Sequence, residues 1–267
     1  MNAPAKINLA LVVGPLRPDG KHEVLTVYQR VDLGDAIGVE PAADTVVEGF
    51  EGDTIVRSAL DALAEAAGAA AAWRVRIDKR IPLAAGLAGG SSDAATALRL
   101  ANATLPQPLP PARLHELART LGADVPFFLT DGPQLGSGDG GDLTPLDLPQ
   151  DYACVLLLPA GETKPSTAAV YAAFDERGGA EGYVARAARL RSALAGVRRP
   201  RDLAALPPND LASSPLAAEL RALGAFRADG SGAGPTLYGL FDDRAAASAA
   251  AARLAPLGRT WIVAPAW

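Results

Sequence analysis

The chain has 267 residues, enough to bury a large core and to form two domains. Its net charge of −5 argues against a nucleic-acid binder, and the short basic run at 198–201 is expected to be a solvated loop. With one cysteine and two histidines, the sequence can form neither an internal disulfide nor a zinc cluster. The single thiol suits a reducing compartment, so we expect a cytoplasmic location.

Strands and helices alternate in the first half of the chain. Strands are predicted at 6–13, 23–32 and 36–40, with the Pro-Asp-Gly turn at 18–20 linking the first two, and alternating polar and apolar residues predict a further strand at 74–78. Apolar residues at helical spacing predict helices at 53–67 and 111–120. The second of these helices begins on prolines and ends before Gly122, and residues 123–129 are expected to be extended.

The second half of the chain indicates a further α/β domain. An apolar run at 152–158 predicts the buried strand that opens it. Helices at 165–175, 181–195, 213–223 and 243–254 follow, with strands at 236–241 and 260–263. Residues 131–151, rich in Gly, Asp and Pro, are the expected junction, so we predict domains at 1–149 and 150–267. The apolar and alanine-rich stretches at 7–13, 66–72 and 245–252 are too short or too polar for a signal peptide or a membrane span.

The segment IPLAAGLAGGSSDAATAL at 81–98 stands between a predicted strand and a predicted helix. Its three glycines, Gly86, Gly89 and Gly90, permit close approach of a ligand to the backbone. Ser91 and Ser92 are good candidates for the N-cap of the helix that follows. A glycine loop before a helix start points backbone N–H groups and a helix dipole at one spot, which favours an anion.

The segment also has a simpler explanation, and it differs from two well-known phosphate-binding motifs. Such a loop also occurs where tight packing of a strand on a helix requires glycine. The segment lacks the Lys of the G-x-x-x-x-G-K-[ST] loop and the spacing of G-x-G-x-x-G. No G-x-G-x-x-G follows the first predicted strand either, which argues against a Rossmann oxidoreductase.

Three further stretches carry chemistry-bearing residues. APAKINLAL at 3–11 places Lys6 and Asn8 at the start of the first strand, and LGADVPFFL at 121–129 places Asp124 after a helix end. GSGAGPTLYGLF at 230–241 is a second glycine loop. Each has an ordinary explanation by itself, as a solvated lysine, a turn aspartate and a plain loop.

Taken together, these stretches resemble the kinases of the GHMP superfamily, over essentially the whole chain. The resemblance is carried by PAKINL at 4–9, DGKHE at 19–23, the loop at 82–95, GADVPFF at 122–128, NDL at 209–211 and the late loop at 231–236. It implies a two-domain α/β fold, with an N-terminal ATP-binding domain, a C-terminal mixed α/β domain and an active site in the cleft between them.

The resemblance also implies a catalytic apparatus. The family wraps the ATP phosphates with the backbone amides of its glycine loop, which here comprises Pro82, Ala84, Ala85, Gly86, Leu87, Ala88, Gly89, Gly90, Ser91 and Ser92. Asp124 would accept the proton of the substrate hydroxyl, and Lys6 would hold Asp124 ionised and neutralise charge on the transferred group. Mg²⁺ is expected with ATP, with Ser92 as a candidate ligand, although the sequence does not fix the metal ligands.

Within the superfamily, the chain is most similar to members that phosphorylate the 2-hydroxyl of a cytidyl diphosphate sugar alcohol of the non-mevalonate isoprenoid route. Those relatives hold the cytosine between two aromatic rings, and a His binds the base edge. Here the resemblance assigns the base edge to His22 and one ring to Tyr171, and it places Asn8 in the substrate site. Lys21 stands where the family has the second ring, a Tyr, so we expect weaker affinity for cytosine.

Other departures from the family leave the expected ATP site intact. Ala84, Ala85 and Ala88 occupy positions that often hold Gly, and alanine is expected to adopt the required backbone there, outside the left-handed region. Asp53 replaces an Asn near the adenine, and Ala233 replaces a Ser in the late loop.

Two alternatives to this reading stay open, namely a GHMP kinase of another small alcohol and a catalytically idle nucleotide-binding regulator. The presence of both Lys6 and Asp124 argues against the idle reading. We expect a small-molecule substrate, no nucleic-acid or membrane partner, and a monomer or a weak homodimer.

Overall fold

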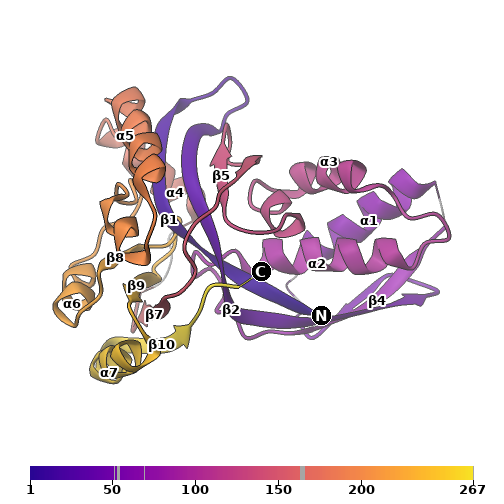
Figure 1. The fold of residues 1–267 in the computed structure, drawn as a ribbon. Coiled ribbons are helices and arrows are strands. Elements are labelled where there is room, and N and C mark those ends of the chain that lie inside the picture. The colour runs from indigo at the N-terminus through magenta and orange to yellow at the C-terminus, as the bar shows by residue number, and fades with distance from the viewer. Residues whose placement is uncertain (51, 53–54, 69, 163–165, 267) are drawn as a thin grey trace. The chain divides into compact units, whose positions relative to one another are not determined.

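The computed structural model describes residues 1–50, 52, 55–68, 70–162 and 166–266. The described chain forms two compact units (Figure 1). The first contains residues 1–5, 33–83 and 88–131, and the second contains residues 6–32, 84–87 and 132–267. Asp53, the predicted start of the first helix and the predicted start of the helix at 165 lie outside the described residues.

Two long paired strands, β1 (Asn2–Leu16) and β2 (His22–Ala42), contribute residues to both units. The expected break between strands at 23–32 and 36–40 is wrong, because β2 runs through it. Gly34 explains this continuity, since a Cβ at this position would lie 2.3 Å from Oδ1 of Asn2. A glycine that reads as a turn signal is here required by close packing.

The first unit packs helices on a small sheet. β4 (Ala72–Asp78) pairs antiparallel with residues 36–42 of β2 and parallel with β3 (Val46–Glu48). Helices α1 (Ile55–Ala67), α2 (Gly89–Ala103) and α3 (Pro111–Leu121) pack together and lie over these strands (Figure 1). Buried side chains such as Leu60, Leu63 and Trp73 fill this core. The strand and helices predicted here are confirmed, apart from their ends.

Residues 123–129 are not extended as expected. Pro126–Leu129 form the 3₁₀ helix η1, entered by a turn in which the N–H of Val125 donates to the carbonyl of Gly122. The N–H of Phe128 then donates to the carbonyl of Val125. Proline at the first helical position fixes a backbone angle that suits this turn.

The second unit contains two strand arrangements. Residues 26–28 of β2 pair with β5 (Gln134–Ser137), which pairs with β6 (Asp142–Pro145). A separate antiparallel sheet has the order β10-β7-β9-β8. Its strands are β7 (Ala153–Pro159), β8 (Arg227–Gly230), β9 (Leu237–Phe241) and β10 (Gly258–Val263).

Helices complete the second unit. They are α4 (Thr167–Glu176), α5 (Tyr183–Gly196), α6 (Leu216–Ala222), α7 (Arg244–Leu254) and the 3₁₀ helices η2 (Pro200–Ala205) and η3 (Ala255–Leu257). Helix α7 packs on β7, β9 and β10 through a core that includes Val155, Leu157, Phe241 and Leu254. All helices predicted for this part are present, with shifted ends.

Four strands of the structure, β3, β5, β6 and β8, lack a sequence prediction. Each has three or four residues, too few to show alternation, and pairing with a neighbouring strand supplies the order that propensity does not. Residues 131–151, expected to be a junction, therefore contain the β5–β6 pair. The boundary at residue 150 stays a prediction.

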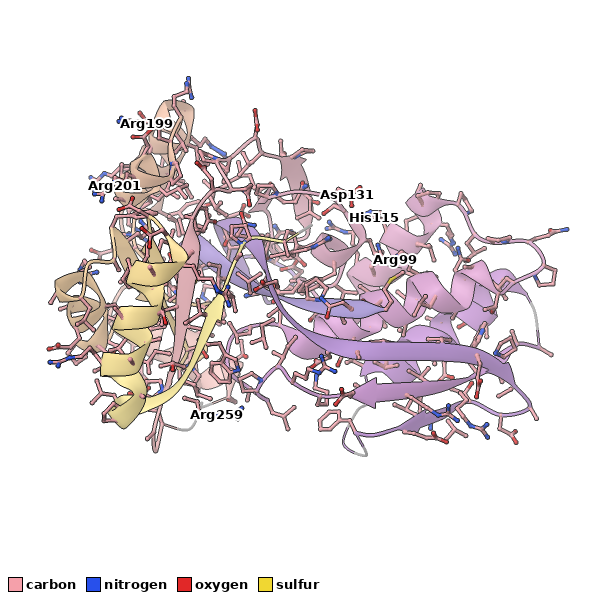
Figure 2. The ribbon with its side chains drawn as sticks, turned by 60° about the horizontal axis from the view of Figure 1, so that its bottom comes forward. Arg99, His115, Asp131, Arg199, Arg201 and Arg259 are labelled. Atoms are coloured by element: carbon pink, nitrogen blue, oxygen red, sulfur yellow. The ribbon has the colours of Figure 1, made fainter. Side chains whose placement is uncertain are left out.

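The basic run at 198–201 lies at the start of η2 and pairs with acidic residues. Arg199 contacts Asp202 at 3.5 Å, and Arg201 pairs with Asp242. Figure 2 shows Arg199 and Arg201 at the outside of the ribbon. The side chains of Arg199 and Arg201 are exposed as expected, but the run enters a 3₁₀ helix rather than staying a loop. No helix in the described part of the chain is long and apolar enough to cross a membrane.

Candidate functional site

The loop between β4 and α2 has an unusual backbone. Gly86 has a φ of 84°, and the non-glycine residues Ala84 and Ala88 have φ values of 53° and 54°. These alanines therefore lie in the left-handed region, against expectation. The left-handed conformation costs a residue with a Cβ roughly 1–2 kcal/mol, so the loop is held in place by its surroundings at a cost.

Helix α2 begins at Gly89, so the expectation that Ser91 or Ser92 forms the N-cap is wrong. Ala88 occupies that position and provides no side-chain hydrogen bond. The left-handed turn at Ala88 starts the helix earlier than a serine cap would. The first N–H groups of α2 are thus left without a side-chain cap, which is the arrangement that suits an anion.

The hydroxyl of Ser92 is buried and has no hydrogen-bond partner in the described structure. A buried hydroxyl without a partner costs free energy, which a ligand at the helix start would offset. Its oxygen is also of the hard type that Mg²⁺ prefers. Among the described residues, no group of three His, Cys, Asp or Glu side chains could hold a metal by itself.

The middle of this loop packs, within the second unit, against the late glycine loop. A Cβ at Gly86 would lie 2.2 Å from the carbonyl oxygen of Ser231, and a Cβ at Gly234 would lie 2.3 Å from the backbone N of Gly86. The hydroxyl of Ser231 donates to the carbonyl of Gly86 at 3.0 Å. Close packing therefore requires glycine at 86 and 234, and the positive φ of Gly86 adds to the requirement there.

Lys6 lies where these two loops meet. Its ammonium group donates to Oδ1 of Asn8 at 2.6 Å and to the carbonyl of Gly86 at 3.3 Å. Asn8 in turn donates to the hydroxyl of Thr26 at 2.7 Å, and all three side chains are buried. The first strand therefore carries a buried, oriented cation. This brings together Lys6, Asn8 and the centre of the glycine loop.

Asp124 follows α3 in the first unit. Gly122 ends this helix as expected, and Asp124 stands two residues before Pro126, the start of η1, with its side chain partly exposed. Lys6 belongs to the second unit. The pairing of Lys6 with Asp124 stays a prediction.

A second cation, Lys79, lies at the other end of the glycine loop, in the first unit; its side chain is mostly buried, and sequence reasoning did not find it. The ammonium group of Lys79 lies 2.5 Å from Oδ2 of Asp35 and 2.7 Å from Oδ2 of Asp93. Asp35 also accepts the N–H groups of Arg80 and Ile81, at 2.6 and 2.8 Å. Lys79 thus ties the interior of β2, at Asp35, and the start of the loop to the first turns of α2.

The charges of this cluster do not balance, because one ammonium group faces two carboxylates. Burial raises the pKa of Asp93 to about 7, although the contact with Lys79 opposes the shift. The pKa of Lys79 is also raised, because its two acidic partners outweigh its burial. Protonation of Asp93 would leave the cluster electrically neutral.

His22 and Tyr171, predicted to bind a base, are brought together in the second unit. Their rings are stacked, with centroids 4.8 Å apart, and Phe174 meets His22 edge-on at 5.9 Å. Nε2 of His22 lies 2.9 Å from Oδ1 of Asp175. Asp175 was missed by sequence reasoning, although it lies four residues after Tyr171 and therefore on the same helical face.

Lys21, the largest departure from the expected pattern, has a partner. Its ammonium group lies 2.6 Å from Oδ2 of Asp139, in the turn between β5 and β6. Lys21 is half exposed and Asp139 mostly buried. The lysine thus links the β1–β2 turn to the β5–β6 turn.

Comparisons with known proteins agree with these features. The family model "GHMP kinases N terminal domain" matches residues 54–132, and "GHMP kinases C terminal" matches residues 208–257. The chain is 39% identical to a 4-diphosphocytidyl-2-C-methyl-D-erythritol kinase of Nocardia farcinica, covering 97% of this chain and 90% of that one. It is 41% identical to the Deinococcus radiodurans protein of the same name, covering 98% and 90%.

Solved structures give the same result. The structure of a 4-(cytidine 5'-diphospho)-2C-methyl-D-erythritol kinase matches with a TM-score of 0.81 and 34% identity, covering 100% of this chain and 99% of that one. The Methanococcus jannaschii mevalonate kinase matches with a TM-score of 0.77 at 11% identity, covering 100% and 98%, and shares the fold alone. The chain therefore belongs to the 4-diphosphocytidyl-2-C-methyl-D-erythritol kinases, a family with the GHMP kinase fold.

Proposed function

We propose that this protein transfers the γ-phosphate of ATP to the 2-hydroxyl of 4-diphosphocytidyl-2-C-methyl-D-erythritol, a step in non-mevalonate isoprenoid biosynthesis. The observation that carries the proposal is near-full-length identity of 36–41% to curated relatives of that name. Three features support the proposal: the buried Lys6 would be the cation, the uncapped start of α2 the phosphate site, and the paired rings of His22 and Tyr171 the base site.

In the proposed reaction, Asp124 accepts the proton of the substrate hydroxyl while its oxygen bonds to the γ-phosphorus. The bond from that phosphorus to the bridging oxygen breaks, and ADP leaves. Lys6 offsets the negative charge on the transferred group, and its bond to Asn8 fixes where the ammonium group points. Such transfers depend mainly on positioning and electrostatic stabilisation, which these groups provide.

The phosphates of ATP would be held by backbone N–H groups of residues 82–92, at the start of α2. Mg²⁺ fits this site because the unpartnered Ser92 hydroxyl offers one oxygen ligand, while phosphate and water supply the others. When bound, the metal would neutralise part of the phosphate charge. The roles of Asn8, Lys21, His22 and Tyr171 in holding the substrate belong to the same proposal.

A cytoplasmic location is also proposed, on the ground that the one cysteine, Cys154, is a free thiol. That the protein acts as a monomer or a weak homodimer stays a prediction.

A substrate panel tests the proposal. ADP release is followed with 4-diphosphocytidyl-2-C-methyl-D-erythritol, homoserine and mevalonate, each with ATP and Mg²⁺. Turnover of the cytidyl substrate alone is the expected result. Faster turnover of homoserine or mevalonate would identify a kinase of another alcohol, and release of no ADP with any of them would favour an idle nucleotide-binding protein.

A further inference from the structure

Asp175 is a half-exposed carboxylate that makes one contact of functional interest. Its Oδ1 lies 2.9 Å from Nε2 of His22, and its side chain is 51% exposed, against 7% for the imidazole. An ion pair so exposed contributes little to stability. The arrangement therefore calls for an explanation other than holding helix α4 in place.

Helix α4 is fixed without Asp175. Ser166 caps its N-terminus by accepting the N–H of Ala169. The fully buried ring of Phe174 packs with Leu11, Val13, Val24 and Leu211. Phe174 anchors the helix, so the neighbouring Asp175 is carried to a defined position beside the imidazole.

A carboxylate only accepts hydrogen bonds, so the hydrogen shared with Asp175 belongs to Nε2 of His22. In a neutral imidazole, Nδ1 is then left as an acceptor. In the described structure, the imidazole makes this one hydrogen bond, and its remaining contacts are the rings of Tyr171 and Phe174. The stacked rings hold the plane of the imidazole, while the carboxylate selects its tautomer.

We propose that Asp175 is a positioning residue that fixes His22 as the Nε2–H tautomer and so presents Nδ1 as a hydrogen-bond acceptor to the pyrimidine of the substrate. Cytosine offers an amino group at C4, which an acceptor binds, whereas uracil offers a carbonyl oxygen there. The tautomer thus selects a cytidyl over a uridyl substrate. This inference rests on the proposed function and adds the group that sets its base specificity.

The tautomer can be measured without any activity. The chain has two histidines, so ¹⁵N-histidine labelling gives two imidazole spin systems, which a His115→Gln variant assigns. His115 lies on α3 (labelled in Figure 2), in the first unit, and serves as an internal reference. At about pH 9, where imidazoles are ordinarily neutral, His22 should be the Nε2–H tautomer. An Nδ1–H tautomer would overturn the inference.

The variant Asp175→Asn should mix the two tautomers, because an amide both donates and accepts. Its ratio of kcat/KM for the cytidyl substrate over the uridyl analogue should fall about tenfold, through KM rather than kcat. Glu176→Gln removes the same charge from the next residue on α4, which makes no contact with His22, and should leave the ratio unchanged. In a His22→Ala background, Asp175→Asn should have no further effect on the ratio.

Each result decides between named explanations. An unchanged tautomer and an unchanged ratio in Asp175→Asn would overturn the inference. An equal loss in Glu176→Gln would assign the effect to charge alone and would also overturn it. If the unmodified protein turns over neither pyrimidine substrate, the proposed function fails, while the tautomer measurement still judges the role of Asp175.

Discussion

The ammonium group of Lys6 and the side-chain oxygen of Asn8 lie 2.6 Å apart, both buried, two residues apart on one face of β1. Alternate residues of a strand share a face, so the spacing Lys-x-Asn is enough to bring them together. Asn8 is then held by Thr26 on the neighbouring strand. The pairing of β1 with β2 therefore fixes the direction of the Lys6 ammonium group.

Replacing Lys6 with Met keeps most of the volume and removes the charge. We expect kcat to fall about 10²-fold or more, with a smaller rise in the KM for ATP, because the proposed role is to stabilise the transition state. Steady-state kinetics with both substrates measure the two effects. A rise in the KM for ATP with unchanged kcat would make Lys6 a binding residue only, and thermal unfolding serves as the folding control.

The left-handed backbone at Ala88 predicts that glycine is the better residue there. Ala88→Gly should raise the free energy of unfolding by up to about 1 kcal/mol, since the relief of strain exceeds the entropy lost by glycine. Ala85 is the matched control, because it lies in the same loop without a positive φ. Ala85→Gly should lower stability by about 0.5–1 kcal/mol, and denaturant unfolding of both variants is the measurement. Equal losses in the two variants would show that Ala88 is unstrained.

Stability should depend on the protonation of Asp93. Its pKa of about 7 in the folded protein lies above the ordinary value of about 4, so the folded chain holds a proton that the unfolded chain releases between these values. This contribution is fully present below about pH 4 and is lost as the pH rises through 7. Through this group, the free energy of unfolding should fall by up to about 1.4 kcal/mol for each pH unit between these values.

Asp93→Asn removes this proton while leaving an oxygen to accept from Lys79. Denaturant unfolding at several pH values between 4 and 8 gives the difference in the free energy of unfolding between the variant and the unmodified protein. The variant should gain relative stability as the pH rises. A constant difference across this range would contradict the raised pKa.

The sequence predicted the parts of this fold that follow from local pattern. Pro111 and Gly122 mark the ends of α3, and the apolar run at 152–158 marks β7, because these signals act within a few residues. The early start of α2 at Gly89 and the continuous β2 were not predictable in this way. The first follows from the left-handed backbone at Ala88, which the sequence pattern does not show, and the second from the distant contact of Gly34 with Asn2.

The site shows the same division. Lys6, Asn8 and His22 were predicted as site residues because they stand in motifs of contiguous residues. Lys79, with its partners Asp35 and Asp93, was missed because a charged residue after a strand reads as solvated until its burial is known. Asp175 was missed because its partner, His22, lies 153 residues away in the sequence.

Lys21 offers a test of substrate choice. Lys21→Tyr should lower the KM for the cytidyl substrate by up to about tenfold, because a stacked base gains about 1–3 kcal/mol. Lys21→Met is the control, since it breaks the ion pair with Asp139 and removes the proposed substrate contact without adding a ring, so its KM should not fall. If both variants change the KM equally, the ion pair and not the missing ring governs affinity.

The transfer of phosphate to the cytidyl substrate, with Asp124 as the base, is the central claim. It is tested most directly by following, in ³¹P NMR spectra, the new phosphate monoester formed from ATP and 4-diphosphocytidyl-2-C-methyl-D-erythritol, with the unmodified protein and with Asp124→Asn. The account predicts a monoester on the 2-hydroxyl with the unmodified protein. In the folded, ATP-binding variant, the rate of its formation should fall by about 10²-fold or more. Formation of the monoester at an undiminished rate by Asp124→Asn, or no monoester with the unmodified protein, would contradict it.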